Sequence, residues 1–354
     1  MFSRRRLLRL LLILIGLPLL YVAGAIGLAM LTDYQPAPTE AVAWTGGTAD
    51  TPPDTLRFLT WNLGYGGLGY GADFFYDGGE TVRMPRDSVA AYVAGSRSTL
   101  AQLEPKPDFL LLQEVDRASR RSYQTDMTEG LTEALPAFGQ AFATNYDVTY
   151  IPIPLLNPMG GVLSGLLTMS PYRPDTAVRH AFAGNYAWPT GLFFLDRCFL
   201  AIRYARSDGD LLVINTHNSA FDDGSLRATQ MEQLAGALRQ AYAEGMYVIV
   251  GGDWNQTPPG FAGVPGLPAP DWAVDGRFQV PAAYPDTGWQ WVFDPTVPTN
   301  RHLVAAFDPD TTPRNVIDFF LVSPNVEPLS VRGVDLGFRH SDHQPVQMEV
   351  ALRP

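Results

Sequence analysis

Short apolar runs alternate with amphipathic segments along most of this chain, and polar residues repeatedly end the apolar runs. Runs of this length and composition are typical of strands. Eight are predicted to be strands: residues 56–62, 108–115, 162–170, 198–205, 210–217, 246–254, 316–323 and 344–352. Two segments, residues 86–104 and 225–244, are predicted to be helices, the second with Ser225 as its N-cap. The 354 residues are compatible with one large α/β domain.

The N-terminal segment is predicted to lie outside this domain. Residues 1–9 carry four arginines, and residues 10–31 contain no charged residue over a length sufficient for a transmembrane helix. Because clustered arginines stay on the cytoplasmic side, residues 32–354 are placed across the membrane, in the periplasm or outside the cell. An uncleaved signal anchor is favoured over a cleaved leader, since the apolar stretch exceeds a normal signal-peptide core.

Composition narrows the function of the remaining chain. Residues 32–54 are rich in Pro, Thr, Ala and Gly and are predicted to be a linker before a domain at residues 55–354. Without residues 1–31, which hold four arginines and no acidic residue, the net charge changes from −11 to −15. This acidity weakens a nucleic-acid-binding interpretation, although a bound divalent metal supplies local positive charge. The single cysteine, Cys198, excludes an intramolecular disulfide and a cysteine-based metal cluster.

Two features are left with open interpretations. Residues 256–313 contain many prolines and aromatics with little periodicity, and are predicted to be a folded excursion over one rim of the domain. The aromatic residues of GNYAWPTGLFF (184–194) and DTGWQWVFDP (286–295) either pack loops onto the core or form a rim that faces a membrane or a substrate.

Polar residues at the ends of the predicted strands form one chemical set. They are Asn62, Glu114, His217, Asn218, Asp253, Asn255, Asp318, Asp342 and His343. Carboxylate and amide oxygens suit Mg²⁺, Mn²⁺ or Ca²⁺, and histidines exchange protons near neutral pH. This is what metal-assisted phosphoester hydrolysis requires. Other chemistries fit less well, because the chain has no GxxxxGK[ST] or HExxH motif and Ser341, Asp342 and His343 are consecutive.

Six motifs in order resemble the endonuclease/exonuclease/phosphatase (DNase I-like) superfamily. They are TWNLGYGG, LLLQEVD, INTHNSAF, VGGDWNQTP, VIDFFLVS and HSDHQPV, and the resemblance covers about residues 55–352. It implies a four-layer α/β sandwich, in which two mixed β-sheets pack face to face with helices outside and the site lies at one rim. It also makes residues 55–354 the catalytic domain.

The resemblance implies a metal site and a water-orienting carboxylate. Asn62, Glu114 and Asp342 correspond to metal-binding positions, with Glu114 as the principal ligand. Asp253 resembles the carboxylate that orients or activates the attacking water, and Asn255 the residue that binds phosphate beside it. The implied cofactor is Mg²⁺, with Mn²⁺ or Ca²⁺ as alternatives, and whether one or two metals act stays open.

The same resemblance implies two catalytic histidines. His343 resembles the catalytic histidine oriented by Asp318, and His217 the second histidine; which of them is the base stays open. Asn218 and Arg197 are predicted to contact the substrate.

These predictions together describe a membrane-anchored, metal-dependent phosphoesterase that faces away from the cytoplasm. Its substrate is a lipid head group, a small phosphorylated metabolite or a nucleic acid, and no protein partner is evident. Two alternatives are an extracytoplasmic DNase-like nuclease and a catalytically silent binding domain on the same fold.

Overall fold

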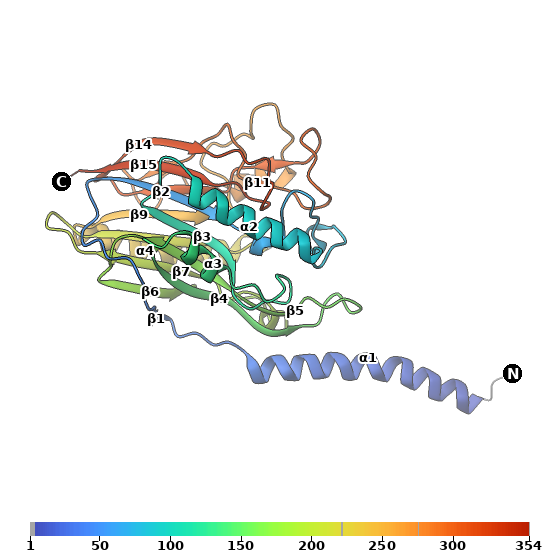
Figure 1. The fold of residues 1–354 in the computed structure, drawn as a ribbon. Coiled ribbons are helices and arrows are strands. Elements are labelled where there is room, and N and C mark those ends of the chain that lie inside the picture. The colour runs from blue at the N-terminus through green and yellow to red at the C-terminus, as the bar shows by residue number, and fades with distance from the viewer. Residues whose placement is uncertain (1–3, 221, 275, 354) are drawn as a thin grey trace.

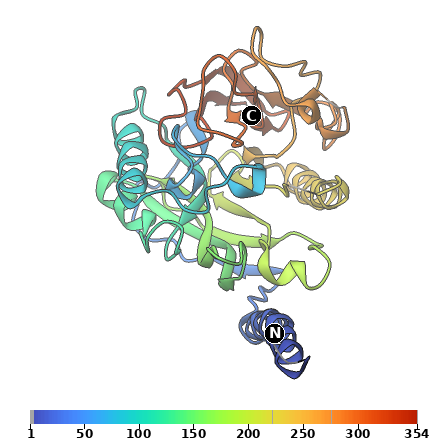
Figure 2. The ribbon, with the colours of Figure 1, turned by 90° about the vertical axis from the view of Figure 1, so that its right-hand side faces the viewer.

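Two large β-sheets pack face to face, and helices cover the outer face of each sheet, so the domain has four layers (Figures 1 and 2). The structure is a computed structural model that describes residues 4–220, 222–274 and 276–353. Phe221, the last residue of the INTHNSAF motif, lies outside the described residues, as do residues 1–3 and 354. The architecture confirms the predicted α/β sandwich of two mixed sheets with outer helices.

The first sheet has seven strands. In spatial order they are β1 (Thr39–Ala41), β6 (Thr176–Ala181), β7 (Cys198–Tyr204), β8 (Leu211–His217), β9 (Tyr247–Asp253), β13 (Asp318–Val322) and β10 (Gln290–Val292). Only β8 and β9 are parallel, in a register that pairs His217 with Asp253. The carboxyl ends of these two strands therefore lie at the same edge of the sheet.

The second sheet has six strands. In spatial order they are β14 (Val326–Gly333), β15 (Val346–Leu352), β2 (Thr55–Asn62), β3 (Phe109–Asp116), β5 (Gly160–Ser170) and β4 (Gly139–Ile151). Its one parallel pair is β2 and β3, which places Asn62 beside Gln113. A separate short ribbon joins β11 (Asn300–Arg301) to β12 (Arg314–Asn315). All eight predicted strands are present, and β1, β4, β6, β10, β11, β12 and β14 were not predicted.

Helices seal the two outer faces. Both predicted helices form, as α2 (Arg86–Gln102) and α4 (Ser225–Ala243). Helix α2 and the shorter α3 (Met127–Ala134) cover the six-stranded sheet, and α4 covers the seven-stranded sheet (Figure 2). The short 3₁₀ helices are η1 (Gly64–Gly66), η2 (Phe75–Asp77), η3 (Thr190–Phe193), η4 (Asp271–Val274) and η5 (Gly276–Phe278).

The prediction that Ser225 caps α4 is wrong. Gly224 occupies the N-cap position with no side-chain hydrogen bond, and the Asp222 carboxylate accepts from the backbone N–H groups of Leu226 and Arg227 instead. The Asp222 carboxylate, a few residues before the helix, thus accepts hydrogen bonds from backbone N–H groups of the first turn that have no partner within the helix.

Strand alternation explains why polar residues collect at one rim between the sheets. The inner faces meet in a buried apolar core that includes Phe58, Leu111, Val213, Ile249 and Phe320. Side chains at i and i+2 of a strand share a face, so every second residue after these core residues also lies on an inner face. Near one rim these inner-face residues are polar. These positions are Asn62, Gln113, His217 and Asp253, and Asp318 begins the antiparallel β13 at the same rim.

The N-terminal helix α1 spans Arg4–Thr32, and its segment Leu12–Thr32 is the one described helix long and apolar enough to cross a membrane. The linker predicted over residues 32–54 is not a free spacer along its whole length. Its residues Thr39–Ala41 form β1 and extend the seven-stranded sheet by pairing with β6, and Thr45 bridges to Gln140. Backbone pairing with an open sheet edge fixes a segment whose composition gave no strand signal.

Gly252 permits a close approach between β8 and β9 beside the site. A Cβ atom on Gly252 would lie 1.9 Å from the Thr216 carbonyl oxygen, so backbone would have to move. We expect Gly252→Ala to lower the free energy of unfolding by about 3 kcal/mol, measured by urea unfolding. The matched control is Gly236→Ala in α4, where nothing lies within 4 Å and alanine should stabilise by about 1 kcal/mol. Equal midpoints for Gly252→Ala and the unmodified protein would contradict this explanation.

Candidate active site

The polar rim opens into a cavity of about 360 Å³ between the two sheets and the surrounding loops. Most of the predicted site residues line it: Glu114, Arg197, His217, Asp253, Asn255, Asp342 and His343. Asn62 and Asp318 lie immediately behind these residues and are fully buried. Segments from both sheets, far apart in the chain, therefore converge on one site, as the sequence motifs predicted.

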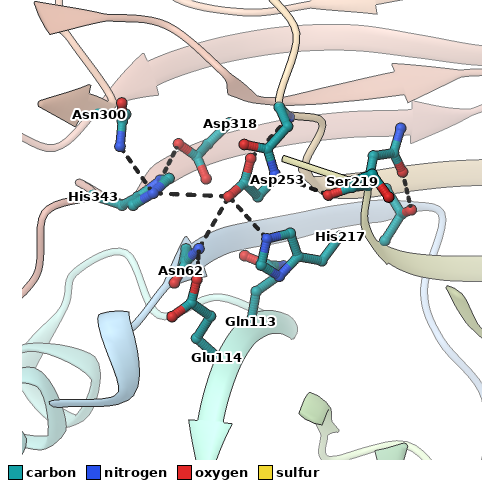
Figure 3. Close-up of polar contacts among 12 residues, drawn as sticks. Asn62, Gln113, Glu114, His217, Ser219, Asp253, Asn300, Asp318 and His343 are labelled. Carbon is teal, nitrogen blue, oxygen red and sulfur yellow. Dashed lines mark hydrogen bonds and ion pairs between the residues drawn. The ribbon is translucent and has the colours of Figure 1, made fainter. Parts of the chain in front are cut away.

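The Asp253 carboxylate is the centre of the cluster (Figure 3). Its Oδ2 accepts a hydrogen bond of 3.0 Å from Asn62 Nδ2 and lies 3.4 Å from His217 Nε2 and 3.8 Å from His343 Nε2. Its Oδ1 accepts from the backbone N–H of Asn255 at 2.9 Å. One buried oxygen thus faces two imidazoles and an amide, which is the geometry required to hold a water between groups that exchange protons.

His343 is held in a fixed orientation by Asp318. Its Nδ1 lies 2.8 Å from Asp318 Oδ2, and its Nε2 lies 3.0 Å from the Asn300 side-chain amide (Figure 3). Burial lowers the pKa of the His343 imidazole, but the carboxylates of Asp318, Asp342 and Asp253 raise it by more, so its pKa is well above the usual value. Burial raises the pKa of Asp318 to about 6, although the imidazole opposes this. Nε2 therefore faces the cavity while Nδ1 faces the buried acid.

Glu114 reaches the cavity through a distortion of β3. Regular alternation from Leu110 and Leu112 would point it outwards, towards α2 and α3. A register shift between Leu112 and Val115 and a left-handed backbone at Glu114, with φ of 51°, turn the side chain inwards instead. Non-glycine residues adopt this conformation at a cost of about 1–3 kcal/mol and are concentrated at functional sites.

Oxygen ligands collect around Glu114. Its Oε1 accepts from Asn62 Nδ2 at 3.2 Å, and Asp342 and Asp77 line the same cavity. Burial raises the pKa of Asp342 to about 7; the His343 charge opposes this, and the Glu114 and Asp77 carboxylates add to it. A bound divalent cation would stabilise the charged form of a carboxylate whose pKa is raised by neighbouring carboxylates. A second group of atoms that could hold a metal ion, from Asp253, Asp318 and His343, lies within 4.8 Å of one another.

Two nitrogen atoms of residues that line the cavity have no hydrogen-bond partner among the described residues. They are Nδ1 of His217 and Nη1 of Arg197, and both atoms are buried. Burial lowers the pKa of His217 well below its usual value, and the nearby Arg197 and His343 charges lower it further. The site therefore offers a neutral imidazole and a guanidinium nitrogen whose hydrogen-bonding capacity is unused.

The Asn218 side chain, predicted to contact the substrate, is not among the side chains that line the cavity. That side chain points away from the cavity, where it accepts from Thr216 Oγ1 at 2.8 Å and donates to Met231 Sδ at 3.3 Å. The backbone of Asn218 contributes instead: its carbonyl accepts from Asn255 Nδ2 at 2.9 Å, and its N–H donates to the Asp253 carbonyl at 3.0 Å. Asn255, with a φ of 50°, lies beyond the end of β9, so the alternation of that strand does not extend to it. Trp254 packs away from the site and is fully buried.

The excursion at residues 256–313 supplies site residues that sequence reasoning missed. Asn300 bonds to His343, and His302, Leu303, Trp272 and Phe278 line the cavity. The two aromatic segments divide between their two interpretations. Trp289 of the second is packed on the core, whereas the first places Tyr186 and Phe194 at the cavity and leaves Trp188 exposed.

A sequence model of the Endonuclease/Exonuclease/phosphatase family matches residues 59–343. The search of curated proteins found no match. Three solved structures are similar to this chain. An endonuclease/exonuclease/phosphatase from Beutenbergia cavernae is 19% identical, with 85% of this chain and 72% of that chain covered and a TM-score of 0.53. D. rerio TDP2 with a single-strand DNA product is 16% identical (84% and 99% covered, TM-score 0.53), and ANGEL2, a 2′,3′-cyclic phosphatase, with adenosine-2′,3′-vanadate is 13% identical (89% and 99% covered, TM-score 0.51). At these identities the similarity shows the fold.

Proposed function

Because the chain belongs to the endonuclease/exonuclease/phosphatase family, whose members are hydrolases acting on phosphoesters, we propose that it is a membrane-anchored, metal-dependent phosphoesterase. It hydrolyses a phosphodiester, or a phosphomonoester, by in-line attack of an activated water. The observation that carries the proposal is the position of Asp253 Oδ2, within 3.8 Å of both His217 and His343 at a cavity lined by Arg197.

The donor set of the site fits a hard divalent cation, and family enzymes generally depend on one. Glu114, Asn62 and Asp342 would hold it through oxygen atoms, with Mg²⁺ as the cation these ligands favour. The inward turn of Glu114 and the raised pKa of Asp342 support this assignment, since Glu114 is turned into the cavity that Asp342 lines and its charge helps to raise the pKa of Asp342. A bound cation supplies charge neutralisation at a phosphoryl oxygen and lowers the pKa of its water.

The protein's own residues position the reacting atoms. Asp253 accepts a hydrogen bond from the attacking water and orients it towards phosphorus, on the side opposite the leaving group. His343, fixed by Asp318, directs Nε2 at the reacting centre, where it hydrogen-bonds a phosphoryl or leaving-group oxygen. His217 and Arg197, which line the same cavity, donate to, or exchange a proton with, the oxygens on which negative charge develops.

The N-terminal helix supports a location across the membrane from the cytoplasm. Leu12–Thr32 has a mean hydropathy of 2.3 and is 11% buried, so its apolar surface is suited to a bilayer. The arginines at positions 4–6 and 9 hold the N-terminus in the cytoplasm, and the domain follows on the other side. The acidity of the domain favours a small or membrane-borne substrate over polymeric nucleic acid.

The proposal is tested with the purified full-length protein on a panel of substrates. We expect hydrolysis of at least one of bis(p-nitrophenyl) phosphate, sphingomyelin vesicles, inositol phosphates and plasmid DNA in the presence of Mg²⁺ or Mn²⁺. EDTA should abolish turnover, and excess Mg²⁺ should restore it. Failure to hydrolyse every substrate with Mg²⁺, Mn²⁺ or Ca²⁺ would favour the silent binding domain instead.

A further inference from the structure

Two loops beside the cavity contain no charged residue. They are residues 152–159 (PIPLLNPM), which join β4 to β5, and residues 182–195 (FAGNYAWPTGLFFL), the part of the β6–β7 loop that precedes Asp196 and Arg197. Charged residues make up 17% of the chain, so two adjacent uncharged loops differ from the rest of its surface. The second loop is attached to the strand that leads into the first, because the Tyr146 hydroxyl of β4 donates to the Phe193 carbonyl at 2.9 Å.

Large apolar side chains project from these loops into solvent. Ile153 is 44% exposed, Leu155 58%, Leu156 98% and Trp188 69%, and we call these four residues the apolar rim. Outside α1, the described part of the chain exposes only eight large hydrophobic side chains, and half of them belong to this rim. Single exposed hydrophobics are ordinary, but a cluster of them indicates an interaction surface.

The membrane helix lies against the same surface. The Tyr21 hydroxyl is 2.9 Å from the Tyr150 hydroxyl and donates to the Pro152 carbonyl at 3.3 Å, immediately before the first loop. Ala25 and Ala29 are buried, and α1 contacts η3 of the second loop as well as β4. The last turns of α1 thus run beside the domain (Figure 1), and a bilayer around α1 reaches both loops.

The loops that carry the apolar rim also form one wall of the cavity. Met159 of the first loop and Tyr186, Phe194 and Leu195 of the second line it. A lipid beside the rim would keep its acyl chains in the bilayer and present its phosphate to the cavity from this side. Continuity between the membrane helix, the rim and the cavity wall favours a lipid surface over a protein partner.

We propose that the apolar rim enters the bilayer next to α1 and that the site hydrolyses the phosphodiester of a membrane lipid head group. The second half rests on the phosphoesterase function proposed above. The docking half depends only on the exposed loops and their contact with α1.

Docking is tested without measuring activity. Full-length Leu156→Cys is labelled with an environment-sensitive fluorophore in phosphatidylcholine nanodiscs, since the native Cys198 is fully buried. Lipids with a nitroxide on the acyl chain should quench at least about half of the fluorescence, because interfacial side chains lie about 5–10 Å deep. The control is Leu329→Cys on β14, at the edge of the six-stranded sheet opposite to β4. Leu329 is 47% exposed, and the label at this position should lose little fluorescence. Equal quenching at the two positions would overturn docking.

The substrate is tested with a variant in which Ile153, Leu155, Leu156 and Trp188 are all replaced by serine. Turnover of sphingomyelin or phosphatidylcholine vesicles should fall about tenfold or more, because four apolar side chains no longer enter the lipid. Turnover of the soluble bis(p-nitrophenyl) phosphate should stay unchanged. Unchanged lipid turnover, or an equal loss on both substrates, would overturn the role of the rim. Activity of the unmodified protein on the soluble ester alone would exclude a lipid substrate. If the unmodified protein hydrolysed neither substrate, the phosphoesterase function would be refuted. The quenching experiment would still decide whether the rim docks on the membrane.

Discussion

Replacing His343 by alanine should lower kcat for phosphoester hydrolysis by about 10³-fold, because the reaction loses the imidazole whose Nε2 faces Asp253 at 3.8 Å. The loss should appear in kcat more than in KM, since this nitrogen acts on the charge that develops in the transition state. Steady-state kinetics with saturating Mg²⁺ on the best substrate of the panel measures the effect.

The replacement also leaves the buried Asp318 carboxylate without its partner, so loss of activity must be separated from loss of structure. His343→Gln retains a side-chain amide that can donate to Asp318, and it should be nearly as inactive as the alanine variant while remaining folded. His340→Ala, a few residues earlier and outside the cavity lining, is the matched control and should keep full activity. Turnover of a folded His343→Gln protein at the unmodified rate would remove His343 from the mechanism.

The sequence predicted the parts of this fold that strand alternation and parallel pairing determine. Asn62, His217 and Asp253 each lie on the inner face of a parallel strand. A polar residue that ends an otherwise apolar inner face therefore indicates the rim between the sheets at which the site lies. The motif resemblance supplied the rest of the cluster, including Asp318 and His343. The inward position of Glu114 depends on a β-bulge, which alternation alone would have placed on the wrong face.

Residues that loops bring to the site were not predictable in the same way. Asn300 lies in the irregular excursion, and its bond to His343 depends on a two-residue ribbon, for which the sequence has no periodic signal. The Asn218 side chain lies outside the cavity lining because it follows the end of β8, and beyond a strand end side-chain direction is set by local hydrogen bonds. The edge strand β1 escaped prediction because a partner strand, and not its own composition, fixes its conformation.

Glu114→Gln should remove metal-dependent turnover by at least about 10³-fold, because it neutralises the principal oxygen ligand without changing its shape. Glu114 keeps its left-handed backbone in this variant, so the protein should stay folded. Without metal, the variant should be at least as stable as the unmodified protein, since Glu114 no longer repels the Asp342 and Asp77 carboxylates. Urea unfolding in EDTA, together with kinetics in Mg²⁺ and Mn²⁺, measures both effects.

Metal linkage separates a ligand role for Glu114 from a merely structural one. At Mn²⁺ concentrations about 100 times the dissociation constant, the unmodified protein should gain about 2.7 kcal/mol of unfolding free energy, because only the folded state binds the ion. Glu114→Gln should gain little under the same conditions. The matched control is Glu133→Gln on the exposed face of α3, which loses the same charge far from the cavity and should respond to Mn²⁺ as the unmodified protein does. A full Mn²⁺ response in Glu114→Gln would place the metal on other residues, with the Asp253, Asp318 and His343 group as the next site to test.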